Sequence, residues 1–435
     1  MTRRAYLLIG IYILLDFPWA TLGHSSPASE VNPSPPQNLN ALVQEAIARN
    51  PEILAARHAI AASRARIPQA GAWPDPTVSL SYGGNALPPF TVMRADPSSA
   101  RQVMAEQMVP YPGKARLRTE IASRDADAET LANEAVERRV AAEVKQDYFD
   151  LTYVGQSLAL LQKDREALEG FEKVTEARYS VGKAAQQDVL RAQLEVTQLL
   201  QRAVLLNQQR RTLQAQINTL RAAPLDASVS TPATVQPSPF SYSQSQLEAA
   251  ATANYPVLKQ RQTMVDQSRL SVDLARKETR PDFSVGYLYM QRDGLPDMYG
   301  ITLSTSLPLF HRRKQDMAVA EAAANLESAR EMHANELIML RNQVQQEFLE
   351  VQATEQLLTL YAQGIRPQSS LTLESSINSY QTGAVDFLTM LSNFQAIVDA
   401  ELNHDMQVAS HEKALARLEE LTGLNLIQEG DIGHE

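Results

Sequence analysis

The side chains that could carry chemistry are few and widely spaced in this chain of 435 residues. There is no cysteine, which excludes disulfides, thiolate metal sites, cysteine nucleophiles and an anchor on a lipidated N-terminal cysteine. Two of the seven histidines, His404 and His411, could line one helix face, but a satisfied surface role fits them better than a metal site, which needs three or four ligands. No Gly-rich phosphate loop or catalytic constellation occurs at useful spacing. The sequence therefore predicts neither an enzyme nor a cofactor, and no metal site.

The acidic residues offer a different chemistry, the attraction of cations. The formal net charge is −10 at pH 7. This charge argues against a nucleic-acid partner, which needs a basic face, and is compatible with an acidic lumen that attracts cations. Methionines flank the expected strands at positions 104, 108, 290 and 298, but methionine more often fills gaps in a core than binds a ligand.

Several short segments of the chain occur twice, about 200 residues apart. This period is too long for a solenoid repeat of ~20–50 residues and has the size of a duplicated domain half. Each repeat is expected to run helix, two strands, long helix, tight turn, helix. The paired segments are Pro74-Asp75-Pro76 with Pro281-Asp282-Phe283, Tyr179-Ser-Val-Gly182 with Tyr380-Gln-Thr-Gly383, and Asn50-Pro51 with Tyr255-Pro256.

Each repeat contains two expected strands, at about 77–84 and 101–109 and again at about 283–291 and 299–307. In the third of these, Phe283, Val285 and Tyr287 alternate with small or polar residues. Such alternation is typical of an antiparallel sheet with one dry and one wet face. It is equally typical of a membrane β-barrel with a polar interior. The strands alone leave both interpretations open.

The helical segments carry heptads that predict coiled-coil packing. The expected helix from Pro112 to Tyr179 would span ~100 Å at 1.5 Å per residue. Two shorter helices, 186–221 and 243–277, would together match that length and place the Pro/Ser-rich stretch 224–239 at mid-height. A linker between two separate domains is the alternative for this stretch. The heptad positions are Ala192, Leu199, Leu206, Leu213 and Leu220, and Leu337, Val344, Val351, Leu358 and Ile365.

Residues 1–24 combine a charged start, a short apolar stretch and a small-residue exit, which predicts a secretory signal peptide. No apolar run reaches the ~20 residues of a transmembrane helix. Four strands cannot close a barrel wide enough for a channel, so strands in a membrane would require several chains in one barrel. The expected organisation is a disordered leader 25–38, a first repeat 39–223 with helical hairpin 112–221, a connecting segment 224–243, a second repeat 244–424 with hairpin 311–421, and a tail 425–435.

A turn signature, Tyr-x-x-Gly followed by Asp-Val-Leu, occurs at Tyr179 to Leu190 and in modified form at Tyr380 to Leu388. With the duplication and the strand pairs, it makes the chain resemble the TolC-type outer membrane efflux proteins from Leu39 to about Leu424. The resemblance implies a mainly α fold with a small β part, assembled as a homotrimer. A twelve-stranded β-barrel would cross the lipid of the outer membrane, and an α-helical barrel would extend into the periplasm. The resemblance implies a passive exit duct that joins a periplasmic adaptor and an inner-membrane resistance-nodulation-division transporter.

The same resemblance assigns roles to the two turns. It implies a periplasmic gate at Asp188, whose matching position in the second repeat is Thr389, followed by Ser392 as the next residue facing the lumen. Asp386 comes three residues early and is expected to cap the helix, although it is also a candidate for the gate. The residues implied in adaptor docking are Val181, Gly182, Lys183, Thr382, Gly383 and Ala384.

Two further segments, Pro74-Asp75-Pro76 and Pro110-Tyr-Pro-Gly-Lys114, resemble the heavy-metal branch of the family, which serves pumps for cobalt, zinc, cadmium and copper. Arg312, Arg313 and Lys314 fill the corresponding place in the second repeat, although basic residues at a barrel exit also face lipid headgroups or water. The alternatives are the same duct serving drugs or other small organic molecules, or a periplasmic coiled-coil adaptor. Adaptors, however, carry one hairpin with lipoyl-like and barrel modules.

Overall fold

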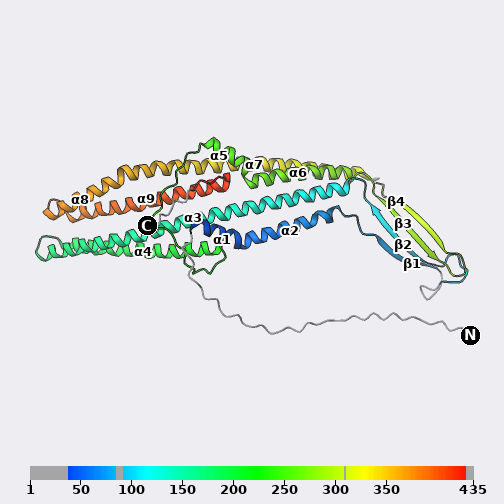
Figure 1. Cartoon of the computed structure of the whole chain (residues 1–435), viewed down its shortest axis with the longest axis horizontal. Helices are drawn as coiled ribbons and strands as arrows, with labels where there is room; N and C mark the ends of the chain where they lie inside the picture. Colours follow the sequence, from blue (N-terminus) through cyan, green and yellow to red (C-terminus); the bar gives the residue numbers. More distant parts are fainter. Residues whose placement is uncertain (1–37, 85–91, 308–309, 428–435) are drawn as a thin grey trace, which may run out of the picture. The chain divides into compact units, whose positions relative to one another are not determined.

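The computed structural model describes residues 38–84, 92–307 and 310–427, all of which belong to one compact unit, Gln37–Glu435. The expected signal peptide, the leader up to residue 37 and residues 428–435 of the tail lie outside the described residues. Within the unit, long helices run side by side and the four strands continue from one end of them (Figure 1). No described helix is both long and apolar enough to cross a membrane.

The elements confirm a mainly α fold with a small β part and an internal duplication. The four strands form one antiparallel sheet in the order β1-β2-β3-β4. The first repeat consists of α1 (Leu39–Arg49), α2 (Pro51–Gly71), β1 (Thr77–Gly83), β2 (Ala100–Val109), α3 (Lys114–Ser180) and α4 (Gln186–Leu220). The second consists of α5 (Gln244–Asn254), α6 (Pro256–Lys277), β3 (Phe283–Gln291), β4 (Met298–Thr305), η1 (His311–Arg313), α7 (Gln315–Leu360), η2 (Tyr361–Ile365), α8 (Arg366–Thr382) and α9 (Phe387–Thr422).

Both repeats break their first helix at the same kind of joint. A proline is the first residue of α2 and of α6, where its missing N–H costs no helical hydrogen bond. At the first joint, Asn50 Nδ2 donates to Leu220 O at 2.8 Å. At the second, Asn254 Nδ2 donates to Thr422 O at 3.0 Å. Each joint is therefore fixed to the end of the last helix of its own repeat.

The helices pack along the heptad seams that the sequence predicts. In the first repeat α3 contacts α1, α2 and α4, and in the second α7 contacts α5, α6 and α9. On α4, the heptad residues Ala192, Leu199 and Leu213 are buried. Helix α3 also contacts α6 and α9, so it joins the two repeats.

The second long helix differs from the expected unbroken α-helix because η2 is a π-helical turn between α7 and α8. Pro367 lies just beyond this turn, and in a regular α-helix its ring would clash with the carbonyl four residues earlier. A π turn relieves this clash by inserting an extra residue. The heptad therefore fails at Ile365, which is 40% exposed. The buried seam continues instead from Leu358 to Leu373 and Tyr380, one residue later than strict heptads require.

The connecting segment packs against α9 through a buried polar cluster. His411, expected at the surface, is only 1% exposed because two helical turns place it on the same face as the buried Leu418. Its Nε2 lies 2.9 Å from Ser238 O, and its Nδ1 lies 3.2 Å from Thr354 Oγ1. The Ser238 N–H and hydroxyl both donate to Glu412. Burial raises the pKa of Glu412, although these two hydrogen bonds oppose the change.

Candidate functional site

The turns between α3 and α4 and between α8 and α9 are both built on a glycine in the left-handed region. Gly182 has φ +72° and Gly383 has φ +82°, where a Cβ is disfavoured. Backbone hydrogen bonds close both turns, from Lys183 N to Arg178 O at 2.8 Å and from Ala384 N to Ser379 O at 2.9 Å. A Cβ added at either glycine would meet no atom of the described residues within 4 Å. Each turn is thus tightly closed on itself and open on its outer side.

The six residues assigned to adaptor docking are all exposed. Val181 is 66% exposed, which is unusual for a valine, and Lys183 lies beside it in the same turn. Both turns lie at the end of the helices opposite the sheet, at the left of Figure 1. The structure therefore brings the two sets of three residues to the same end of the molecule.

A contact that the sequence did not reveal joins the two hairpins just behind these turns. Arg178 Nη1 donates to Tyr380 O at 2.6 Å, and its guanidinium lies 4.5 Å from the centre of the Tyr380 ring. The Tyr380 hydroxyl lies 3.5 Å from Thr175 Oγ1. Arg178 comes directly before the signature residue Tyr179, but nothing in its spacing predicts a partner about 200 residues away. The contact fastens the end of α3 to the end of α8.

The acids after the turns both cap helices. Asp386 is the N-cap of α9 and accepts from Thr389 N at 2.9 Å, which confirms the expected capping role. Hydrogen bonding from Thr389 lowers the pKa of Asp386. Asp188 lies in the first turn of α4 and accepts from Ala185 N at 3.3 Å, a role that the sequence did not predict. Thr389 and Ser392 are exposed on α9, and the gate assigned to these residues stays a prediction.

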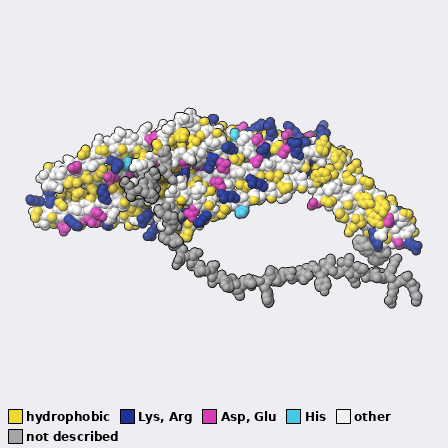
Figure 2. Space-filling view, in the orientation of Figure 1, with side chains coloured by type: hydrophobic (Ala, Val, Ile, Leu, Met, Phe, Trp, Pro, Cys, Tyr) yellow, Lys and Arg dark blue, Asp and Glu magenta, His cyan; other side chains and the backbone are white. Residues whose placement is uncertain are grey.

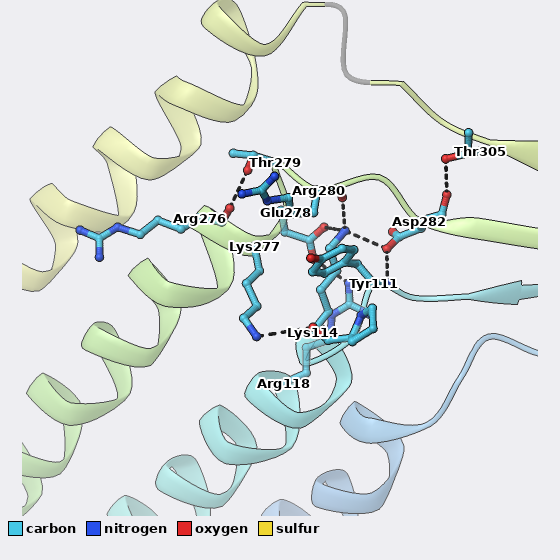
Figure 3. Close-up of polar contacts among 11 residues, drawn as sticks. Tyr111, Lys114, Arg118, Arg276, Lys277, Glu278, Thr279, Arg280, Asp282 and Thr305 are labelled. Carbon is cyan, nitrogen blue, oxygen red and sulfur yellow. Dashed lines mark hydrogen bonds and ion pairs between the residues drawn. The ribbon is translucent and has the colours of Figure 1, made fainter.

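A second polar site lies at the other end of the helices, where α3 meets the sheet (Figure 3). Lys114 is the first residue of α3 and is only 1% exposed. Its Nζ lies 2.8 Å from Asp282 Oδ1 and 3.0 Å from Glu278 Oε2, and it donates to Arg280 O at 2.9 Å. Tyr111 N also donates to Asp282 Oδ1, at 2.7 Å. We call this group of five residues the clasp.

The electrostatics of the clasp favour the charged form of Asp282. Burial alone would raise the pKa of Asp282. The hydrogen bonds from Lys114 and Tyr111 and the charges of Lys114 and Arg118 outweigh burial and lower that pKa. Arg118 also pairs with Glu278 at 2.8 Å. The Pro110 to Lys114 segment therefore fastens the first repeat to the second through a buried ammonium group.

One buried acid interrupts the seam between the hairpins. Asp164 lies on α3 between the buried Leu161 and Leu168 and is itself 8% exposed. Burial, with a further contribution from Glu401, raises its pKa to about 6. Among the residues that the structure describes, its Oδ2 has no hydrogen-bond partner. Across the described ranges, no group of three or more His, Cys, Asp or Glu side chains is arranged to hold a metal ion.

A single chain leaves large apolar surfaces uncovered. Strands β1 and β4 each have one unpaired edge in the four-stranded sheet. Hydrophobic side chains gather over the strands in Figure 2, and those exposed include Leu80 at 79% and Ile301 at 83%.

A groove of about 1090 Å³ between α3 and α4 is lined by Val204, Leu220 and Asp147, among others. Burial, with repulsion from Asp150 and Glu143, raises the pKa of Asp147 to about 6.

Solved structures share this fold. The chain is similar to the outer-membrane channel OprN, at 16% identity and a TM-score of 0.77, over 88% of this chain and 89% of that one. It is similar to the outer membrane protein VceC from Vibrio cholerae, at 15% identity and a TM-score of 0.76, over 88% and 96%. It is also similar to the CmeC outer membrane channel of Campylobacter jejuni, at 17% identity and a TM-score of 0.73, over 94% and 93%.

The search of curated proteins finds no match to the chain. The family comparison does find one, in two segments that correspond to the two repeats. Residues 42–223 and 247–424 each match the family described as outer membrane efflux protein. Because these segments cover most of the sequence, the chain belongs to the outer membrane efflux protein family.

Proposed function

We propose that three copies of the chain form a closed exit duct, with the sheets joined into one barrel and the helices into another. As a family member, the protein is an outer membrane efflux channel and not an enzyme. The observation that carries the trimer proposal is the sheet, whose four strands leave β1 and β4 with open edges. Open edges in lipid cost several kcal/mol for each unpaired backbone group, and a barrel with a water channel needs more than about eight strands.

The two glycine turns form the docking tip in this proposal. A periplasmic adaptor contacts Val181, Gly182 and Lys183 in one hairpin, and residues 382–384 in the other. The exposure of all six residues and the open outer side of both glycines support this role. The adaptor links the duct to an inner-membrane resistance-nodulation-division transporter.

The gate lies just inside this tip. Asp188, Thr389 and Ser392 face the lumen in the proposed assembly, and the Arg178–Tyr380 contact holds the two hairpins of each subunit together. Asp386 lies three residues before Thr389, the position that matches Asp188 in the second repeat, and caps α9. We therefore propose one acidic ring, from Asp188, rather than two.

Heavy-metal cations are the proposed cargo. The net charge of −10 and the resemblance of the strand-flanking segments support them. The clasp gives Lys114 a structural role whatever the cargo, so the test must be made on transport itself. Loss of metal resistance in a strain that lacks the protein would support metal cargo, whereas loss of dye or drug resistance alone would favour the organic alternative.

Export by tip variants tests the duct directly. Val181→Glu combined with Lys183→Glu replaces one apolar and one basic side chain of the turn by two acidic ones and leaves Gly182 in place. We expect lost export from a protein that still fractionates with outer membranes and still cross-links as a trimer. Unchanged export in this variant and in Gly383→Glu would contradict the docking assignment.

A further inference from the structure

The clasp joins the two repeats within one chain, and the repeats imply a second place where the same clasp is needed. In the observed clasp, Lys114, which follows β2, meets Asp282, which precedes β3. The sheet order makes β2 and β3 neighbours. In a closed ring of subunits, β4 of one copy and β1 of the next would be neighbours in the same way.

The strand register shows how closely the two hairpins correspond. Adding 207 to Thr77 gives Ser284, and adding 198 to Glu106 gives Ser304. Thr77 pairs with Glu106 in the first hairpin, and Ser284 pairs with Ser304 in the second. The same two offsets therefore carry β1 onto β3 and β2 onto β4 without a slip.

The fastening of each hairpin to the segment before it also repeats. Gln107 Nε2 donates to Pro74 O at 2.8 Å. Thr305, which lies 198 residues after Gln107, donates from Oγ1 to Asp282 O at 3.0 Å, one residue beyond the Pro281 that corresponds to Pro74. The correspondence thus extends, to within one residue, from the strands to the chain that precedes them, where the acid of the clasp lies.

The offsets assign counterparts to both ends of the clasp. Asp282 minus 207 is Asp75, and Lys114 plus 198 is Arg312, which begins the basic run of Arg312, Arg313 and Lys314. All four of these side chains are exposed, and none of them forms an ion pair within the described part of the chain. The basic run and Asp75 therefore have the charges of a clasp but not its contacts.

These two groups cannot meet within one chain. Asp75 precedes β1 and the basic run follows β4, so both lie at the helix end of the sheet but at its opposite edges. Three strand spacings separate the edges, about 14 Å at about 4.8 Å per spacing. This is beyond the reach of an ion pair, so a partner for either group has to come from outside this chain.

We propose that Asp75 of one subunit is clasped by the basic run of the preceding subunit, whose β4 lies beside its β1, with Arg312 in the place of Lys114. This inference rests on the proposed closed ring and adds the register in which β4 of one subunit pairs with β1 of the next. In the structure, Ala105 of β2 lies opposite Tyr287 of β3. Adding 198 to Ala105 gives Leu303, and subtracting 207 from Tyr287 gives Leu80. Leu303 of one subunit is therefore expected opposite Leu80 of the next. Each subunit boundary then repeats the bond that joins the two repeats within a subunit.

Cysteine cross-linking of the full-length protein in membranes tests the register, because the natural chain has no cysteine. The variant Leu80→Cys/Leu303→Cys should give covalent oligomers under oxidation, including a closed trimer. The matched control Leu80→Cys/Ile301→Cys moves one cysteine by two residues, to a Cα separation of about 7–8 Å that a disulfide cannot span unstrained. Equal or stronger cross-linking in the control would overturn the register.

Charge exchange tests the clasp itself. Asp75→Arg should lower the temperature at which the oligomer dissociates in detergent, and adding Arg312→Asp should restore most of that loss. Asp226→Arg, at an exposed acid outside both junctions, is the matched control and should have no effect. The inference fails if Asp75→Arg behaves like this control or if the exchange restores nothing. In that case the basic run has another role, such as contact with lipid headgroups.

Failure of this inference can be distinguished from failure of the duct proposal. A wild-type protein that forms no closed oligomer contradicts both. A wild-type trimer that ignores the charge exchange and cross-links in a different register contradicts only the inter-subunit clasp.

Discussion

Substitutions in the clasp around Lys114 should differ in how much stability they cost, and the burial of each charged group should set their order. The side chain of Lys114 is 1% exposed, whereas those of Asp282 and Glu278 are 26% and 37% exposed. Removing one partner of a fully buried pair costs about 3–5 kcal/mol, while an exposed pair contributes at most about 1 kcal/mol. The cost of a substitution here therefore depends on which charge is left without a partner.

Lys114→Met keeps the aliphatic stem and leaves two carboxylates that water can reach. We expect it to cost about 2 kcal/mol, between the two limits. The double change Glu278→Gln/Asp282→Asn leaves the buried ammonium without a counter-charge and should cost about 4 kcal/mol. Adding Lys114→Met to that double change should recover about half of the loss, because no unpaired charge then remains buried.

Amide hydrogen exchange of the peptide that spans Tyr111 to Lys114, measured on the assembled protein, reports the local opening. At about 1.4 kcal/mol per tenfold, Lys114→Met should speed exchange there roughly thirtyfold, with little change at the turn near Gly182. The triple variant should exchange more slowly than the double. A triple variant that exchanges faster than the double would show that charge does not hold Lys114, and would refute the reasoning.

Three further predictions concern the helices and the tip. Asp164 has a pKa of about 6 against an ordinary value of 3.8, so the folded state binds the extra proton and stability should fall as pH rises from about 4 to 6. Asp164→Leu should weaken this dependence, because Asp147, whose pKa is also raised to about 6, still contributes to it. The substitution should also raise the melting temperature at pH 7, and an unchanged pH profile would contradict the assignment. Deleting Gly364 from the π turn together with Pro367→Ala, which removes the clash that the turn relieves, should restore continuous heptads and leave a folded trimer by cross-linking. Deleting Ala353 from α7 with the same Pro367→Ala change should not, and equal outcomes would refute the register argument. At Gly383, asparagine tolerates positive φ and should keep export, while glutamate should abolish it in an export assay despite an intact trimer; equal export would locate docking elsewhere.

The sequence predicted the elements that depend on local pattern. Heptads such as Ala192 to Leu213 located the seams, and the alternation around Val285 located the strands. The glycine turns were predictable because positive φ selects glycine, as Gly182 and Gly383 show.

Two of the misses share a physical cause, which is that partners distant in sequence decide burial and charge. His411 was expected at the surface because its spacing to His404 does not reveal that Ser238 packs over it. Lys114 was interpreted through a resemblance, whereas its role depends on Asp282, a residue of the other repeat. The break at Ile365 follows from Pro367, a local signal that the regular heptads obscured.

The number of chains in the complex extracted from outer membranes tests the central claim most directly. Native mass measurement of the full-length protein in detergent should give three chains per complex. In the proposed assembly each chain contributes its four strands to one barrel. A protein recovered from the soluble periplasmic fraction as a single chain would contradict the account.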